Sequence, residues 1–315
     1  MNNVGIEIDL PDNISKNEKS DYLDKYYYSN SKLFEAYKNK ISKYKSIFID
    51  EIQDYKPEWI KIIRDYFAVS NSEIVLFGDV KQNVYKREIQ KRTPIIVQGF
   101  GKWQRLTKPI RFDIFDTSLI LPLIKKYQQT FLSEYEIDEF EEKQKILTDD
   151  KNQTLFELQF IDNKNIEDIV FYIISNIQKF DIHNNDIVIL SNKVKILKEI
   201  DFTIRQNYTF KTITTFETKE FTEKFSLTER EQNNIRKKKK IGFNQNSGKI
   251  KLSTIYSYKG YESECVFLFL EPQQNLEEII YTAITRARKH LVVFTKNHPD
   301  LNKYNDFFKE NLNFI

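Results

Sequence analysis

The sequence is poor in cysteine, glycine and proline, and it contains no long apolar run. Its single cysteine, Cys265, excludes an internal disulfide framework and is typical of a protein of the reducing cytoplasm. This residue lies in the apolar run ECVFLFL, which predicts a core position rather than a nucleophile. No apolar stretch approaches the roughly 18 residues that a membrane span requires, and the first residues lack the pattern of a signal peptide. We therefore expect a cytoplasmic protein with no membrane partner.

Histidine is equally scarce, and the overall charge says little about partners. The three histidines show no metal-ligand spacing, so we predict no metal site built from protein ligands alone. The net charge is +3, but it is unevenly distributed, because IRKKKK at 235–240 is a strong basic cluster. This cluster predicts either a solvated helix face or a nucleic-acid contact through Lys237 and Lys238, and both interpretations stay open.

What the chain does contain is the composition of a folded protein and an alternation of strands and helices. Its 315 residues are 40% apolar and 14% aromatic, which predicts a sizeable core and about two domains. Residues 46–50 indicate a buried strand, 58–69 an amphipathic helix and 73–79 a second buried strand, which is the rhythm of a parallel sheet. Further helices are predicted within 18–44 and over 117–131, 165–180 and 275–290, and Asn275 is the expected N-cap of the last one. Further strands are predicted over 154–160, 186–191, 249–257, 265–270 and 291–294. The sequence thus predicts an α/β fold with a domain boundary near residue 105.

Four polar segments beside these strands carry the candidate chemistry. Asp50 and Glu51 follow the first strand, at the end where parallel-sheet proteins bind ligands. One carboxylate can bind Mg²⁺, and its neighbour can orient or deprotonate a water molecule. The second segment, LFGDVKQNVY at 76–85, adds a glutamine that can contact a terminal phosphate. The third, LSTIYSYKGYESECVFLFL at 252–270, and the fourth, YTAITRARKHLVVF at 281–294, add a polar turn and an arginine.

Together, and in this order, the four segments resemble motifs II, III, V and VI of the UvrD/Rep-type superfamily 1 DNA helicases. The usual forms of those motifs are roughly DExQD, GDxxQxIY, TxHxxKGxE and VALTRA, and the resemblance spans about residues 44–295. It implies RecA-like parallel sheets flanked by helices, of the P-loop NTPase helicase type. Residues 1–105 would be a partial first RecA-like domain with motifs II and III, and 106–315 the second, with motifs IV to VI and no large insertion. The resemblance also implies ATP and Mg²⁺ as cofactors, single-stranded DNA or RNA as partner, and a role such as DNA repair.

The resemblance assigns roles in nucleotide chemistry to residues of both domains. Asp50 would bind Mg²⁺ together with ATP, Glu51 would be the catalytic base, and Gln82 would contact the γ-phosphate. Arg286 would sense that phosphate from the second domain as an arginine finger. Arg111 stands where the motif IV arginine would, although proline and isoleucine precede it in place of asparagine and tyrosine. The other implied nucleotide-binding residues are Tyr85, Gly260 and Glu262, the last of which would contact the sugar.

Nucleic-acid contacts are implied around motif V. Thr254, Tyr256 and Lys259 would contact the strand, since single-strand tracks combine aromatic platforms with cations. Two positions depart from the family pattern. Tyr256 replaces the motif V histidine and can still stack on a base, whereas Arg87 replaces a tryptophan that commonly follows motif III and is a poor platform.

The phosphate-binding loop that the resemblance requires upstream of Asp50 is missing. A P-loop reads GxxxxGK[ST], because glycines let backbone N–H groups approach the phosphates and Ser/Thr completes the Mg²⁺ shell. The two Gly-Lys pairs of this sequence are followed by Trp103 and Ile250, and neither has a glycine five positions earlier. We therefore expect weak or absent ATP hydrolysis by this chain alone. We also expect an incomplete first RecA-like domain that exposes a sheet edge.

Three hypotheses about function stay open. The chain is part of a DNA-dependent ATPase that needs a P-loop segment, either upstream in the same polypeptide or in a partner chain. Alternatively, it is a degenerate, non-hydrolysing module that binds nucleic acid or protein in a repair or defence complex. The third hypothesis is another α/β nucleotide-binding protein with chance matches. Retention of Glu51, Gln82 and Arg286 together favours the first, and the missing P-loop favours the second.

Overall fold

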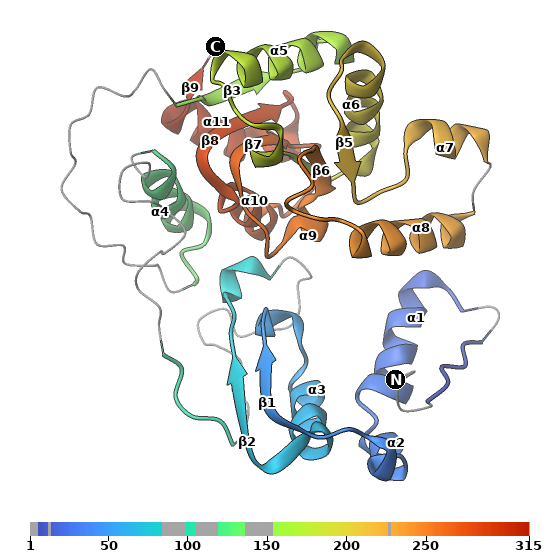
Figure 1. Cartoon of the computed structure of the whole chain (residues 1–315). Helices are drawn as coiled ribbons and strands as arrows, with labels where there is room; N and C mark the ends of the chain where they lie inside the picture. Colours follow the sequence, from blue (N-terminus) through green and yellow to red (C-terminus); the bar gives the residue numbers. More distant parts are fainter. Residues whose placement is uncertain are drawn as a thin grey trace. The chain divides into compact units, whose positions relative to one another are not determined.

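The computed structural model describes residues 6–11, 14–83, 99–104, 119–135, 154–225 and 228–314. The chain forms two compact units, Met1–Arg105 and Leu106–Ile315 (Figure 1). Both units are built on parallel strands.

The first unit is organised around two parallel strands, β1 (Tyr44–Ile49) and β2 (Ala68–Leu76). Side chains alternate between the two faces of a strand, which places Ile47 and Ile49 on one face, where they pack with Ile60 of helix α3 (Pro57–Ile62). The other helical elements of this unit are α1 (Lys16–Leu23), η2 (Asp24–Tyr28), α2 (Ser31–Ala36), η3 (Lys38–Lys40), η4 (Ile52–Asp54), η5 (Ile63–Phe67) and η6 (Val80–Gln82). Because β1 and β2 are parallel, the turns that follow them begin at the same edge of the sheet.

The second unit is organised around a seven-stranded sheet with the order β5-β6-β4-β7-β8-β3-β9. Every pair of neighbouring strands in it is parallel. The strands are β3 (Phe156–Phe160), β4 (Ile187–Ser191), β5 (Thr212–Thr214), β6 (Ile250–Thr254), β7 (Ser263–Phe269), β8 (Ala287–Thr295) and β9 (Asn313–Phe314). Each residue of β4 is buried, as expected for a central strand of a parallel sheet covered on both faces.

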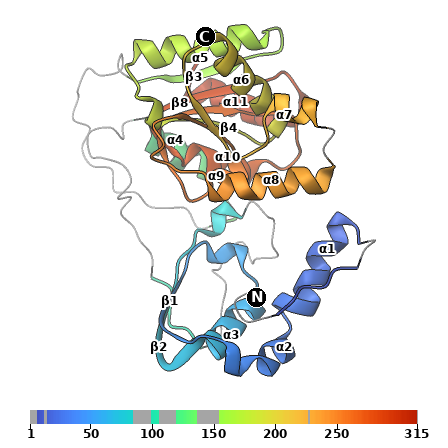
Figure 2. The same cartoon turned by 45° about the vertical axis from the view of Figure 1, so that its right-hand side comes forward.

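Helices cover both faces of the larger sheet (Figure 2). On one face, Ile173 of α5 (Ile166–Lys179) and Leu197 of α6 (Val194–Asn207) join the main core cluster. On the other face α4 (Ile120–Phe131), α10 (Glu277–Ile284) and α11 (Asn302–Asn311) pack together; Tyr127 donates a hydrogen bond to the Glu277 carbonyl and its ring contacts Phe307. The remaining helical elements are α7 (Lys219–Lys224), α8 (Glu229–Ile241), α9 (Ile255–Tyr258), η8 (Asn184–Asp186) and η9 (Pro299–Leu301). The predicted α/β fold of parallel sheets flanked by helices is confirmed.

Element boundaries depart from the sequence prediction in four places. Strand β2 already begins at Ala68, within the predicted helix, and the predicted strand over 249–257 is replaced by helix α9 from Ile255. The last predicted helix is shorter than expected, because β8 begins at Ala287 and pairs with both β7 and β3. Asn275 is not the N-cap: it has a φ of 53° and lies before the helix. In the first and third cases, ladder hydrogen bonds to a neighbouring strand override the local preference for helix.

Candidate nucleotide and nucleic-acid sites

The first candidate site lies at the carboxyl ends of β1 and β2. The Phe77 N–H donates to the Ile49 carbonyl at 2.8 Å, and the Ile52 N–H donates to the Phe77 carbonyl at 2.9 Å. These two bonds continue the pairing beyond the strands and bring the turn after β1 against the turn after β2. The segments that resemble motifs II and III are therefore adjacent, at the edge where parallel sheets bind ligands.

The two adjacent carboxylates of this site have different surroundings. Asp50 is exposed, and its Oδ1 accepts a hydrogen bond from the Glu51 N–H at 2.8 Å. Glu51 has a φ of 54° and a ψ of 46°, a left-handed conformation that is uncommon for a residue other than glycine. Its Oε2 accepts a hydrogen bond from Nε2 of Gln53, whose side chain is fully buried. Asp50 is thus open to a cation from solvent, whereas a buried amide fixes the orientation of Glu51.

Gln53 and Asp79 connect the two turns. Oε1 of Gln53 accepts a hydrogen bond from the Asp79 N–H at 3.2 Å, and Oδ2 of Asp79 accepts one from Nε2 of Gln82 at 3.1 Å. A continuous series of hydrogen bonds therefore runs from Glu51 through Gln53 and Asp79 to Gln82. Sequence reasoning assigned no role to Gln53 or Asp79, although both lie in the polar turns that it singled out.

The second candidate site lies at the amino ends of β7 and β8. Glu262 directly precedes β7, Arg286 directly precedes β8, and the Ser263 N–H donates to the Arg286 carbonyl at 2.9 Å. Nη1 of Arg288 lies 4.0 Å from Oε1 of Glu262. The turn that leads to Glu262 needs a φ of 87° at Gly260, which glycine adopts without a steric penalty. The structure therefore brings Gly260, Glu262 and Arg286 together at one end of two neighbouring strands.

The guanidinium of Arg286 is held inside the second unit and is 1% exposed. Its Nε donates to the Thr282 carbonyl, its Nη1 to the Tyr261 carbonyl and its Nη2 to the Thr285 hydroxyl, each at 3.0 Å. These bonds join the turn after α10 to the turn before β7. A contact between Arg286 and a phosphate would require the guanidinium to exchange some of these bonds for the phosphate.

Thr254 lies at the opposite, carboxyl edge of the same sheet. It is the last residue of β6 and occupies the N-cap position of α9, with its hydroxyl donating to the Ser257 hydroxyl at 2.9 Å. Tyr256 lies within α9 and Lys259 directly follows it; both are half-buried. Because parallel strands begin at one edge and end at the other, the sheet separates Thr254 from the second candidate site.

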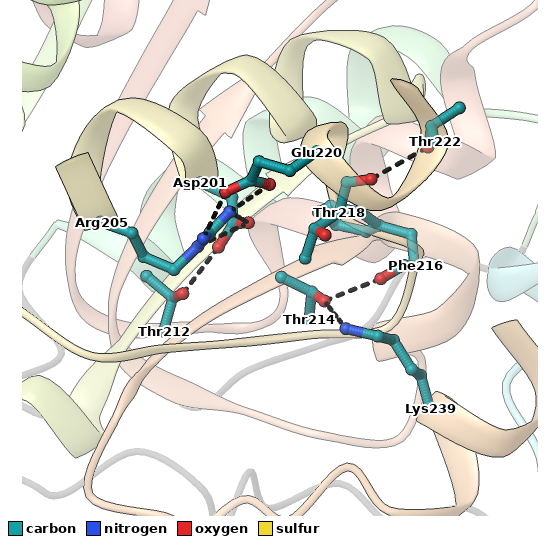
Figure 3. A network of polar contacts seen from close by, with 9 residues as sticks. All are labelled: Asp201, Arg205, Thr212, Thr214, Phe216, Thr218, Glu220, Thr222 and Lys239. Carbon is teal, nitrogen blue, oxygen red and sulfur yellow. Dashed lines mark hydrogen bonds and ion pairs between the residues drawn. The ribbon is translucent and has the colours of Figure 1, made fainter. Parts of the chain in front are cut away.

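The basic cluster lies on α8, and its members have two different environments. Nζ of Lys239 donates to a threonine hydroxyl of β5 at 2.9 Å, and burial lowers the pKa of this lysine (Figure 3). Arg236 donates from Nε and Nη2 to the buried carboxylate of Glu217, at 2.7 and 2.6 Å. Lys237 and Lys238 are exposed. Arg236 and Lys239 thus attach α8 to the rest of the unit. Lys237 and Lys238 remain accessible to a ligand.

A second polar network lies next to this attachment and joins α6, α7 and β5 (Figure 3). Arg205 donates to Asp201 from Nε and Nη2, at 3.1 and 2.9 Å, and to Glu220 from Nη1 at 2.7 Å. The hydroxyl of Thr212 donates to the other oxygen of Asp201 at 2.6 Å. The network borders a cavity of about 370 Å³. The guanidinium of Arg205 thus forms hydrogen bonds with both carboxylates, and the network accounts for the packing of α6, α7 and β5.

Two predicted site residues, Tyr85 and Arg111, lie outside the described residues, as does Arg87. Across the described ranges, no group of three or more His, Cys, Asp or Glu side chains could hold a metal ion. The helices of the same ranges include none that is long and apolar enough to cross a membrane.

Comparison with known proteins gives two family matches that contain the candidate sites. Residues 8–88 match the UvrD/REP helicase N-terminal domain, and residues 249–294 match the UvrD-like helicase C-terminal domain. Among solved structures, the C-terminal domain of a possible DNA helicase from Lactobacillus plantarum matches with 12% identity and a TM-score of 0.36, over 61% of this chain and 94% of that chain. No curated protein matches the sequence. The first family match includes the turns after β1 and β2, and the second includes Thr254, Glu262 and Arg286.

Proposed function

This chain is related to the UvrD-type helicases, and from that relationship we propose that it is part of an ATP-dependent superfamily 1 DNA helicase or translocase. Residues 1–105 would supply a partial first RecA-like domain and residues 106–315 the second. The observation that carries this proposal is the series of hydrogen bonds from Glu51 to Gln82. It holds an acidic base and an amide that could contact phosphate in one connected network, and such networks fix the orientation of their members.

The residues of the first candidate site fit the cation of MgATP better than its phosphates. The exposed carboxylate of Asp50 is the kind of oxygen ligand that Mg²⁺ prefers, and Glu51 could accept a proton from an attacking water molecule. Bound MgATP would supply the phosphate that this water attacks. The sequence contains no GxxxxGK[ST] loop to surround the triphosphate with N–H groups. The proposal therefore includes a P-loop segment, either upstream in the same polypeptide or in a partner chain.

Steady-state ATP hydrolysis tests this function. The purified chain should turn over ATP weakly or not at all, with or without single-stranded DNA. Addition of the P-loop segment should produce hydrolysis that DNA stimulates and that Glu51→Gln abolishes. DNA-stimulated hydrolysis by the chain alone, lost in Glu51→Gln, would show that the triphosphate is held by other groups. Hydrolysis that is unchanged in Glu51→Gln would contradict the assigned role of Glu51.

Single-stranded DNA, or RNA, is the proposed partner, through Thr254, Tyr256, Lys259, Lys237 and Lys238. The exposure of Lys237 and Lys238 supports a backbone contact, and replacement of both by alanine should lower the salt slope of binding by about 1.4. The matched control replaces Lys303 and Lys309 of α11 by alanine, which removes the same charge elsewhere on the second unit. Fluorescence anisotropy over a salt series measures both slopes. Equal slopes in the two double variants would show that Lys237 and Lys238 belong to a plain solvated helix face.

A second candidate function is a non-hydrolysing helicase-like module in a repair or defence complex in the cytoplasm. The missing P-loop favours it. In this case, binding to nucleic acid or protein would be indifferent to ATP and to Glu51→Gln. Addition of a P-loop segment would then restore no hydrolysis.

A further inference from the structure

A cation without a carboxylate partner among the described residues borders the cavity between α6, β5 and α8. This cation is the ammonium of Lys239, which is half-buried and donates a hydrogen bond to the Thr214 hydroxyl at 2.9 Å (Figure 3). The proton of that hydroxyl is used elsewhere, because Thr214 donates it to the Phe216 carbonyl at 2.8 Å. Withdrawal of a charge from water is costly unless the charge is paired, so the ammonium favours an anion beside it.

The carboxylates that attract the Lys239 ammonium are already paired with other cations. These carboxylates are Asp201, Glu217 and Glu220. Arg205 forms ion pairs with Asp201 and Glu220, at 2.9 and 2.7 Å. Two further cations, from α6 and α8, lie 2.7 and 2.6 Å from Glu217. The three carboxylates thus have three other cations as partners, and the charge of Lys239 is in excess.

The edge of the larger sheet adds hydrogen-bond donors to the same cavity. Strand β5 is the terminal strand of the sheet, and both Thr212 and Thr214 line the cavity. The Lys211 carbonyl and the Thr215 N–H form hydrogen bonds with β6 at 3.0 and 3.3 Å, so the odd-numbered residues of this segment face β6. The N–H groups of Thr212 and Thr214 therefore point away from β6, and the described strands of the sheet leave them unpaired. Two backbone donors thus belong to the strand that lines the cavity.

We propose that this cavity binds a phosphate group, with the Lys239 ammonium as its cation and the edge of β5 as the source of N–H donors. An ammonium has three N–H donors, so two remain for a phosphate beside the one that Thr214 accepts. The cavity volume of about 370 Å³ is within the range of small-molecule pockets. The phosphate can therefore belong to an ester, which is either a free small molecule or a nucleic-acid strand. The site is independent of ATP hydrolysis and thus goes beyond the proposed function.

Isothermal titration calorimetry of the full chain with inorganic phosphate, at constant ionic strength, tests the site. Lys239→Met removes the charge and should weaken phosphate binding by about tenfold or more, because a hydrogen bond to a charged group is lost. Lys195→Met is the matched control, because Lys195 is an exposed lysine of α6, and it should bind phosphate like the wild type. Thermal melting without phosphate checks that each variant is folded.

A second pair of variants tests the site without altering Lys239. Gly242 lines the cavity, and a Cβ atom added there would lie 3.7 Å from the nearest heavy atom, which is an ordinary contact. Gly242→Asp places a negative charge at the cavity and should reproduce the loss of phosphate binding. Gly242→Asn has nearly the same shape without the charge and should retain the binding.

The outcomes decide both the existence of the site and the source of the phosphate. The site is wrong if the wild type shows no saturable phosphate binding, or if Lys239→Met and Lys195→Met bind phosphate equally. Fluorescence anisotropy with labelled single-stranded DNA identifies the source once phosphate binding depends on Lys239. A parallel loss of DNA binding in Lys239→Met, but not in Lys195→Met, would assign the phosphate to the strand, and unchanged DNA binding would assign it to a free ester.

Discussion

Gly78 shows how closely the turns after β1 and β2 pack at the scale of single residues. A Cβ atom added at this position would lie 2.5 Å from Oε1 of Gln53 and 2.6 Å from Cγ2 of Ile52, and both of these side chains are buried. Gly78→Ala should therefore lower the free energy of unfolding by about 1–3 kcal/mol, because the added methyl group clashes with both neighbours. Urea denaturation measures the loss, and Gly101→Ala is the control because nothing lies within 4 Å of a Cβ atom there. Equal stability of the two variants would contradict this packing.

Lys251 is a buried cation within β6, and it makes the stability of the second unit depend on pH. Its ammonium donates to the carbonyls of Asn185 and Gln245, and burial lowers its pKa to about 8. Between pH 8 and the ordinary lysine pKa, the unfolded chain binds the proton and the folded chain does not, so the free energy of unfolding rises with pH. We expect a slope of up to about 1.4 kcal/mol per pH unit above pH 8 relative to Lys251→Met. Lys249→Met is the control and should keep the wild-type slope.

At the scale of elements, the buried carboxylate of Glu217 decides whether α8 stays attached to the sheet. Burial raises the pKa of Glu217, but hydrogen bonds from Arg236 and Lys198 outweigh this effect and lower the pKa to about 2. The stabilisation is complete above the ordinary glutamate pKa and is lost as the pH falls toward 2. Glu217→Gln should cost about 3 kcal/mol, because two cations lose their partner.

Hydrogen exchange of the α8 amides in residues 229–241 measures the effect of Glu217→Gln directly. Protection should fall in this variant and remain in Glu223→Gln, which changes an exposed carboxylate on α7. Unchanged protection in both variants would show that α8 is held by other contacts.

The sequence predicts the elements of this protein better than their ends. Five strands of the larger sheet, β3, β4, β6, β7 and β8, lie in segments whose apolar pattern predicts strands, whereas the short strands β5 and β9 were not predicted. The change from helix to strand around Arg286 could not be predicted in this way, because alanine, arginine and lysine favour helices and only pairing with β7 and β3 makes this segment a strand. The same limit applies to the link between Gln53 and Asp79. Gln53 and Asp79 lie in different turns, and no local pattern indicates the left-handed backbone at Glu51, at the start of the first turn.

At the scale of the whole molecule, the two units differ in how much core they contain. The main cluster of the second unit includes side chains from two helices and four strands, whereas two clusters among the described residues of the first unit contain three buried residues each. We therefore expect residues 106–315, produced alone, to unfold in one cooperative transition, and residues 1–105 alone to show little cooperativity. Circular dichroism during urea titration measures both. A second unit that unfolds gradually on its own would mean that its stability depends on the first.

The position of β3 in the larger sheet has a consequence for synthesis on the ribosome. This strand begins at Phe156, but its neighbours are β8 and β9, which begin at Ala287 and Asn313. At about 5–20 residues per second, β3 leaves the ribosome on the order of ten seconds before the strands that pair with it. The apolar side chains of β3 stay uncovered by these strands until then, and contacts between such distant parts of a chain form slowly. Slower translation of the segment between β3 and β9 would prolong this interval, and the nascent chain is most exposed to aggregation and chaperone binding during it.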